Sequence, residues 1–343
     1  MRHYIYTIPS LAVAFCLSGI VSAWCVSKRV SATDDDTENK LPPTCWKGML
    51  VAYFCAVFVM LFFYPFSDLS NIGFFFQSLL FLWGPLPFLI FGSIDDKIQL
   101  SSSRRFQIFL LIAFLQFIQQ APFYYFIGRN EENSWLIIYA FLLPASFWFF
   151  SNAYNSLGKD EGCCEIAFLG LAFTLPFLDF AGDDFSLLLG LILGAAVFGI
   201  LVWNFIFNSK ISLGNGGGLF LGACATSLFF PPFQSYSENP SLSEVCMFFT
   251  VFAFPVYDFC TSFILRIAKE LSWQDHYSHR LLRGGFPLWL VNLIAFTAAG
   301  ILPVLFIKIS EGAIYFGPFA VWAFLLFLDV LAAFLCWKKS GNH

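Results

Sequence analysis

Two adjacent carboxylates, Asp95 and Asp96, are followed by Lys97 at the end of a long apolar run. Charged side chains beside hydrocarbon are costly to maintain without a partner ion or ligand. Hard divalent cations such as Mg²⁺ prefer carboxylate oxygens and complete their shell with water and phosphate oxygens. These residues predict a metal and phosphate site at a membrane surface. The alternative is that the two acids only cap a loop, and this stretch alone does not decide between them.

A second stretch with possible chemistry is the glycine-rich run Gly214-Asn215-Gly216-Gly217-Gly218, which is predicted to open a helix. Glycines before a helix allow backbone N–H groups to approach an anion closely, and the helix dipole adds attraction. A flexible turn explains the same residues more simply.

His276 and His279 are three residues apart, so on a helix they would share a face. Zinc needs three or four ligands, and Asp275 would point elsewhere on that helix, which disfavours a zinc site. With Arg280 beside them, two histidines near an interface fit a phosphate or pyrophosphate contact. A contact with lipid headgroups is the alternative.

Acidic residues also lie inside apolar segments. Asp258 follows Pro255 within such a segment, and a buried acid in a membrane span is a functional candidate by default. Asp329 lies in another segment, and the sequence predicts no role for it.

The elements that must position these residues are predicted to be membrane helices. The chain has 343 residues, of which 59% are hydrophobic and 12% charged, and its mean hydropathy is +0.74. This composition excludes an ordinary soluble globular protein. Open sheets cannot satisfy their backbone in lipid, so we predict an all-α, polytopic membrane protein. Eleven spans are expected, at 4–26, 48–66, 72–92, 106–127, 134–152, 163–181, 185–207, 218–236, 242–266, 286–309 and 312–337.

The distribution of basic residues predicts the orientation. With the N-terminus outside, only Arg2, Arg129 and Lys308 of the 18 lysines and arginines lie outside, and the other 15 lie on the cytoplasmic side. This split follows the positive-inside rule and puts the C-terminus in the cytoplasm. Cleavage of a leader would invert it, so we expect 4–26 to be a retained helix.

We treat 1–343 as a single transmembrane domain. Its polar, glycine-rich and ionisable residues gather in the cytoplasmic loops, which are expected to form the active face. These loops lie near 27–47, 93–105, 153–162, 208–217 and 267–285.

Five short motifs occur in an order and on a side seen in one family. The chain resembles the polyprenyl-phosphate N-acetylhexosamine-1-phosphate transferases of glycosyltransferase family 4, to which the phospho-N-acetylmuramoyl-pentapeptide translocase is related. It is more similar to the branch acting on UDP-N-acetylglucosamine or a related sugar. The resemblance covers roughly 45–290. The motifs are Ser93-Ile94-Asp95-Asp96, Asn152-Ala153-Tyr154-Asn155, Leu213-Gly214-Asn215, Pro255-Val256-Tyr257-Asp258 and His276-Tyr277-Ser278-His279-Arg280-Leu281-Leu282.

The resemblance implies a reaction in which a polyprenyl phosphate, such as undecaprenyl phosphate, takes a sugar-1-phosphate from a UDP-sugar and releases UMP. This is the first step of a lipid-linked cell-surface glycan. It also implies Mg²⁺, with Mn²⁺ as the alternative ion, and a bacterial plasma membrane with the site facing the cytoplasm. A homodimer is left open, and no nucleic-acid partner is expected.

The resemblance also assigns roles to residues. It implies that Asp95 and Asp96 bind metal or assist the lipid-phosphate nucleophile, and that Asn215 takes the third metal position. The residues implied to contact substrate are Lys97, Asn152, Asn155, Asp258, His276, His279 and Arg280.

The chain departs from the family at two carboxylate positions. Asn215 stands where the family has a metal-binding Asp, and Gly158 stands where the family has the first Asp after its asparagine motif. An amide oxygen is a poorer Mg²⁺ ligand than a carboxylate. These departures favour the alternative of an inactive member that binds lipid phosphate or nucleotide sugar. A transporter is a further alternative, although transporter sites lie near mid-membrane rather than at one face.

Overall fold

The structure is a computed structural model. It describes residues 84–98, 100–101, 103–112, 114–115, 135–157, 162–177, 184–207, 213–235, 242–267, 276–309 and 313–340, together with 12–16 and 20. Within these residues every regular element is helical and none is a strand, which confirms the all-α prediction. The predicted span 48–66 and most of 4–26 lie outside the described residues.

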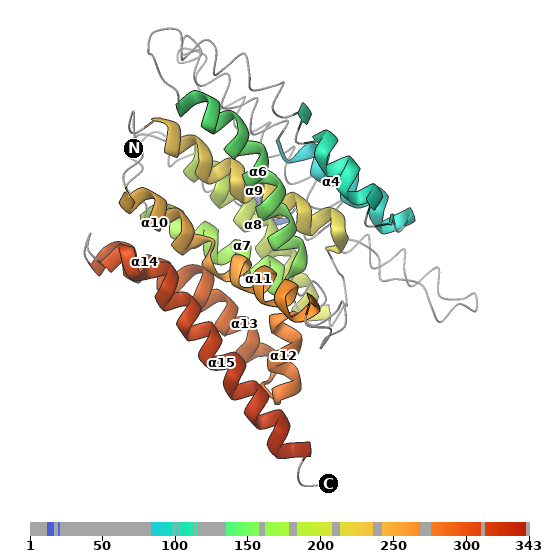
Figure 1. The fold of residues 1–343 in the computed structure, drawn as a ribbon, viewed down its shortest axis with the longest axis vertical. Helices are drawn as coiled ribbons and strands as arrows, with labels where there is room; N and C mark the ends of the chain where they lie inside the picture. The colour runs from blue at the N-terminus through green and yellow to red at the C-terminus, as the bar shows by residue number, and fades with distance from the viewer. Residues whose placement is uncertain are drawn as a thin grey trace.

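The main helices follow the apolar runs of the sequence (Figure 1). The predicted spans 134–152, 185–207, 218–236 and 312–337 each fall on one long helix, and the predicted boundaries differ by a few residues. The helices are α4 (Leu86–Ile98), α6 (Trp135–Ser156), α7 (Cys163–Thr174), α8 (Asp184–Phe207), α9 (Gly214–Ser235), α10 (Leu242–Val251), α11 (Ala253–Ile267), α12 (Tyr277–Gly284), α13 (Leu288–Phe296), α14 (Leu302–Ile309) and α15 (Gly317–Ser340).

Two predicted spans are interrupted. The span 242–266 is divided between α10 and α11, and 286–309 contains a π-helical turn, Thr297–Ile301, between α13 and α14. Such turns are rare insertions in α-helices. An added Cβ on Gly170 of α7 would lie 2.9 Å from Ala299, so the backbone of α7 packs directly against this turn.

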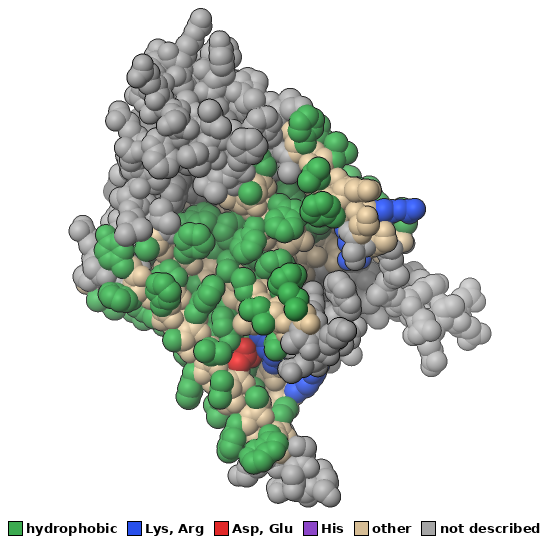
Figure 2. Space-filling model, in the orientation of Figure 1, with side chains coloured by type: hydrophobic (Ala, Val, Ile, Leu, Met, Phe, Trp, Pro, Cys, Tyr) green, Lys and Arg blue, Asp and Glu red, His purple; other side chains and the backbone are tan. Residues whose placement is uncertain are grey.

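In the part of the chain that the structure describes, two helical segments are long and apolar enough to cross a membrane. They are Leu288–Ile309 and Gly317–Trp337, with mean hydropathies of 2.3 and 2.4. Bulky side chains such as Phe319, Phe327 and Trp337 are exposed along α15, and hydrophobic side chains cover much of the face in Figure 2. An apolar surface of this kind suits contact with lipid. The total of eleven spans and their orientation stay predictions.

The last turn of α4 differs from the expected loop. The predicted span 72–92 was expected to end before Asp95, but α4 continues through Asp95 and Asp96 to Ile98. The two acids therefore lie in the last turn of a helix and not in a loop.

Candidate functional site

A close crossing of two helices places the acid pair. An added Cβ on Gly92 of α4 would lie 2.5 Å from the Cα of Gly216 in α9, so no larger residue fits at this contact. A Cβ on Gly216 would in turn lie 2.8 Å from Oγ of Ser93. The glycine-rich run thus opens a helix, as predicted, and Gly216 serves close packing. The crossing brings the last turn of α4 onto the N-terminus of α9.

Asp96 binds the N-terminus of α9. Its Oδ1 accepts a hydrogen bond from the backbone N–H of Asn215 at 2.8 Å, and its Oδ2 accepts one from Gly216 at 3.1 Å. The first N–H groups of a helix have no partner within the helix, and the helix dipole favours a negative charge there. The anion bound at this helix end is therefore the protein's own carboxylate.

Asp95 is held on both carboxylate oxygens, and its residue is only 3% exposed. Oδ1 accepts hydrogen bonds from the backbone N–H of Leu100 at 3.0 Å and from Nε of Arg105 at 2.9 Å. Oδ2 accepts one from Nδ2 of Asn215 at 3.1 Å. All four carboxylate oxygens of Asp95 and Asp96 thus accept at least one protein N–H.

The three residues predicted to bind a metal are brought together by this arrangement. Asp95 and Asp96 supply the hard carboxylate oxygens that Mg²⁺ prefers, whereas Asn215 turns its Nδ2 toward Asp95. Within the described residues no group of three or more His, Cys, Asp or Glu side chains could hold a metal ion. Because all four carboxylate oxygens already accept hydrogen bonds, an ion at Asp95 and Asp96 would compete with those bonds. The side chain of Lys97 lies outside the described residues.

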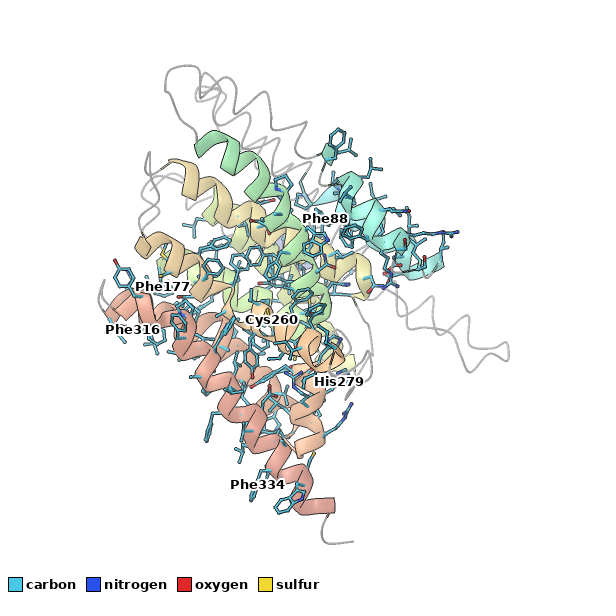
Figure 3. All side chains as sticks on the ribbon, viewed as in Figure 1. Phe88, Phe177, Cys260, His279, Phe316 and Phe334 are labelled. Carbon is cyan, nitrogen blue, oxygen red and sulfur yellow. The ribbon has the colours of Figure 1, made fainter. Side chains whose placement is uncertain are left out.

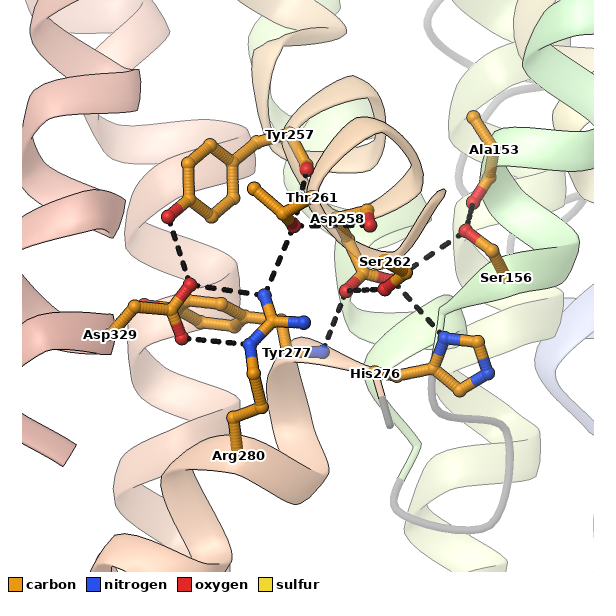
Figure 4. A network of polar contacts seen from close by, with 10 residues as sticks. All are labelled: Ala153, Ser156, Tyr257, Asp258, Thr261, Ser262, His276, Tyr277, Arg280 and Asp329. Carbon is orange, nitrogen blue, oxygen red and sulfur yellow. Dashed lines mark hydrogen bonds and ion pairs between the residues drawn. The ribbon is translucent and has the colours of Figure 1, made fainter. Parts of the chain in front are cut away.

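A second polar cluster surrounds Asp258 of α11 (Figure 4). The Asp258 side chain is fully buried, and its Oδ1 accepts a hydrogen bond from the backbone N–H of Tyr277 at 2.6 Å. Its Oδ2 lies 3.6 Å from Nδ1 of His276 and 3.5 Å from Oγ of Ser156 on α6. Oγ of Ser262 donates to Oδ1 at 3.4 Å. Asp258 therefore fixes the start of α12.

Arg280 forms a two-point ion pair with Asp329 of α15. Nε lies 3.0 Å from Oδ1, and Nη2 lies 3.0 Å from Oδ2. The hydroxyl of Tyr257 donates to Asp329 at 2.8 Å, and Nη2 of Arg280 also donates to Thr261 at 3.1 Å. This accounts for Asp329, to which the sequence assigned no role. Arg280, predicted to contact substrate, lies within a contact between helices.

Burial and charge act on the ionisable groups of α12, which lies outside the predicted spans. Burial lowers the pKa of Arg280, but the hydrogen bond and charge of Asp329 outweigh it, so the pKa is raised and the guanidinium stays charged. Burial, and next the charge of Asp329, raise the pKa of Tyr277 well above its ordinary value, so the phenol stays neutral.

The remaining predicted residues take different environments. Nδ2 of Asn152 donates to the carbonyl of Trp148 at 2.7 Å, within α6. Oδ1 of Asn155 is buried and has no hydrogen-bond partner among the described residues. The rings of His276 and His279 lie 6.0 Å apart, so the two histidines are neighbours (Figure 3 labels His279).

Sequence reasoning missed several partners. Arg105 follows Asp95 by ten residues, and Asp329 lies 49 residues from Arg280. An unassigned acid inside an apolar helix is a signal that a basic partner exists, but the sequence does not say which residue that partner is. Ser156 offered no signal, because a serine at the end of a helix is common.

Comparisons with known proteins cover the region of the acid pair. Residues 78–230 match the family described as glycosyl transferase family 4. A protein from Bacillus subtilis (strain 168), named probable undecaprenyl-phosphate N-acetylglucosaminyl 1-phosphate transferase, is 24% identical over 261 residues. That alignment covers 73% of this chain and 70% of the relative. The family match includes Asp95, Asp96 and Asn215, and it ends before Asp258 and α12.

Proposed function

We propose that this protein is a membrane-embedded polyprenyl-phosphate sugar-1-phosphate transferase. Its residues 78–230 match glycosyl transferase family 4. The match confirms the family resemblance that the motifs indicated. The finer proposal is that the donor is a UDP-N-acetylhexosamine and the acceptor undecaprenyl phosphate. We place the reaction at the cytoplasmic face of a bacterial plasma membrane, where it starts a lipid-linked glycan.

The proposed reaction forms one P–O bond and breaks another. An oxygen of the lipid phosphate attacks the β-phosphorus of the UDP-sugar. The bond between that phosphorus and the oxygen bridging to the α-phosphorus breaks, and UMP leaves with the bridging oxygen. The product is a polyprenyl-diphospho-sugar.

The observation that carries this proposal is the convergence of Asp95, Asp96 and Asn215 at the crossing of α4 and α9. Mg²⁺, held there by Asp95 and Asp96, would neutralise the diphosphate as negative charge develops on the departing UMP. Asp96 anchors the acid pair to α9, and the backbone N–H of Leu100 and Nε of Arg105 orient Asp95. The protein's own contribution is therefore orientation of the two acids.

The second cluster is proposed to contact the nucleotide sugar. His276 and His279 lie beside each other at the start of α12, and Asp258 positions this start through the backbone of Tyr277. Imidazole groups at a helix start are suited to phosphate or base oxygens. Asn152 and Asn155, on the adjacent α6, are proposed to complete the substrate contacts.

Release of UMP tests the proposal directly. Purified protein is incubated with undecaprenyl phosphate, Mg²⁺ and each of several UDP-N-acetylhexosamines, alongside the variants Asp95→Asn and Lys308→Gln. We expect wild type and Lys308→Gln to release UMP with one donor. We expect Asp95→Asn to lose at least about 100-fold in rate, because a positioned charge in a phosphoryl-transfer site is lost. Lys308 is an exposed residue of α14, which makes its variant a matched control.

Absence of UMP release from wild type with every donor would contradict the transferase proposal. Because all four carboxylate oxygens already accept protein hydrogen bonds, the alternative of an inactive binding protein is also supported by an observation. Tight binding of a UDP-sugar without turnover, unchanged in Asn215→Asp, would favour that alternative.

A further inference from the structure

Protein hydrogen bonds join Asp95 and Asp96 to Asn215 at the proposed metal site. We propose that Asn215 is a positioning residue that holds Asp95 in place without a cation and so weakens binding of free divalent ions. This inference rests on the proposed function, because it concerns the ion of the same site.

The direction of the Asn215 side chain is the first argument. Its Nδ2 lies 3.1 Å from Oδ2 of Asp95. An ionised carboxylate only accepts hydrogen bonds, so the amide must present its nitrogen rather than its oxygen to Asp95. A divalent cation at the same carboxylate needs the reverse, because it is bound by oxygens. In this arrangement Asn215 acts as a donor to Asp95 and not as a ligand beside it.

The burial of Asp95 is the second argument. The side chain of Asp95 is only 4% exposed, and a carboxylate this buried is costly without compensating donors. Asn215, Arg105 and the backbone of Leu100 supply those donors to both of its oxygens. The folded arrangement therefore needs no bound cation, and an ion entering the site must displace donors that are already in place.

The amide at Asn215 also affects when the cation binds. Mg²⁺ is commonly bound by one or two carboxylates together with substrate phosphates. Since Asn215 adds no charge, the site gains its missing negative ligands when the diphosphate of a nucleotide sugar enters. We therefore expect the cation to bind with the nucleotide sugar, and the free protein to bind it weakly.

The test measures thermal melting of the purified full chain in detergent, with excess EDTA or with Mn²⁺. Wild type is expected to melt at the same temperature in both. Asn215→Asp places a second carboxylate against Asp95, so it should melt lower in EDTA and recover with Mn²⁺. Its dissociation constant for Mn²⁺ should be about tenfold lower than that of wild type, as one added charge at close range implies.

The matched control exchanges the residue types at positions 95 and 215. The double variant Asp95→Asn, Asn215→Asp keeps one amide facing one carboxylate, so it should melt above Asn215→Asp in EDTA and should not respond to Mn²⁺. The inference would be overturned if Asn215→Asp melted at the same temperature with and without Mn²⁺. It would also be overturned if Mn²⁺ raised the melting temperature of the double variant as much as that of Asn215→Asp. If Asn215→Asp fails to fold in EDTA, its yield of folded protein is compared with and without Mn²⁺, and Mn²⁺ should raise that yield. No step uses substrate, so this result is independent of UMP release.

Discussion

At the scale of single residues, the site is defined by which atom faces which. Asp95 and Asp96 are adjacent in sequence, yet Asp96 caps α9 through backbone N–H groups and Asp95 binds side chains from two segments. The capping interpretation made from the sequence therefore describes Asp96, and the metal and phosphate site stays a prediction. One acid does cap a helix, though not its own, and the other lies where Asn215 and Arg105 meet.

Replacement of Arg105 tests its contribution to Asp95. Its side chain is 41% exposed, and half-exposed ion pairs contribute about 1 kcal/mol or less to the free energy of unfolding. We expect Arg105→Met to lower the melting temperature by a few degrees at most, because Leu100 and Asn215 still donate to Asp95. Arg104→Met, which changes the exposed neighbour, is the control. Equal losses in both variants would show that the Arg105 contact adds nothing.

At the scale of elements, the site depends on how closely α4 approaches α9. The distances from an added Cβ on Gly92 to the backbone of Gly216 leave no room for a methyl group. The same is true farther along α9, where a Cβ on Gly222 would lie 2.4 Å from the carbonyl oxygen of Phe150 in α6. Small residues thus set the spacing of three helices, as is common where helices pack in membranes.

Gly92→Ala should push α4 away from α9. The added methyl group would meet backbone atoms, which cannot turn aside as a flexible side chain can, and overpacking of this kind costs about 1–3 kcal/mol. We expect a lower melting temperature together with weaker binding of a UDP-sugar, measured by calorimetry. Ile94→Ala, at an exposed position of the same helix, should have little effect on either. Unchanged melting of Gly92→Ala would contradict the close crossing.

At the scale of the whole molecule, an ion pair and a hydrogen bond hold α12 against α15 and α11. Arg280 and Asp329 join α12 to α15, and Asp258 joins α11 to the start of α12. Both contacts lie beyond the family match at 78–230. The C-terminal part of the chain therefore holds His276 and His279 in position from outside the matched region.

Loss of the carboxylate at Asp329 should destabilise the fold. Removing one partner of a largely buried ion pair leaves the other charge uncompensated and costs about 3 kcal/mol. We expect Asp329→Asn to melt well below wild type, and the double variant Asp329→Asn, Arg280→Gln to recover part of the loss. If the double variant melts lower than the single one, the two side chains do not act as a pair.

The sequence predicted features that depend on neighbouring residues along the chain. Long apolar runs predicted helices such as α6, α8 and α15, because burial in lipid leaves the backbone little choice. The short motifs brought Asp95 and Asn215 into one hypothesis although they are 120 residues apart. The donor role of the Asn215 amide and the pairing of Arg280 with Asp329 depend on how helices meet. The spacing of residues along the chain does not contain that information.

One helix, α6, connects α9 to the second cluster. Near its C-terminal end, α6 contacts Gly222 of α9 through Phe150, and it reaches Asp258 through Ser156. Both contacts lie beyond Pro144, on one uninterrupted stretch of helix with a fixed rise per residue. This stretch therefore fixes the distance between the middle of α9 and Asp258. A change in its length would move Asp258, and with it the start of α12, relative to α9.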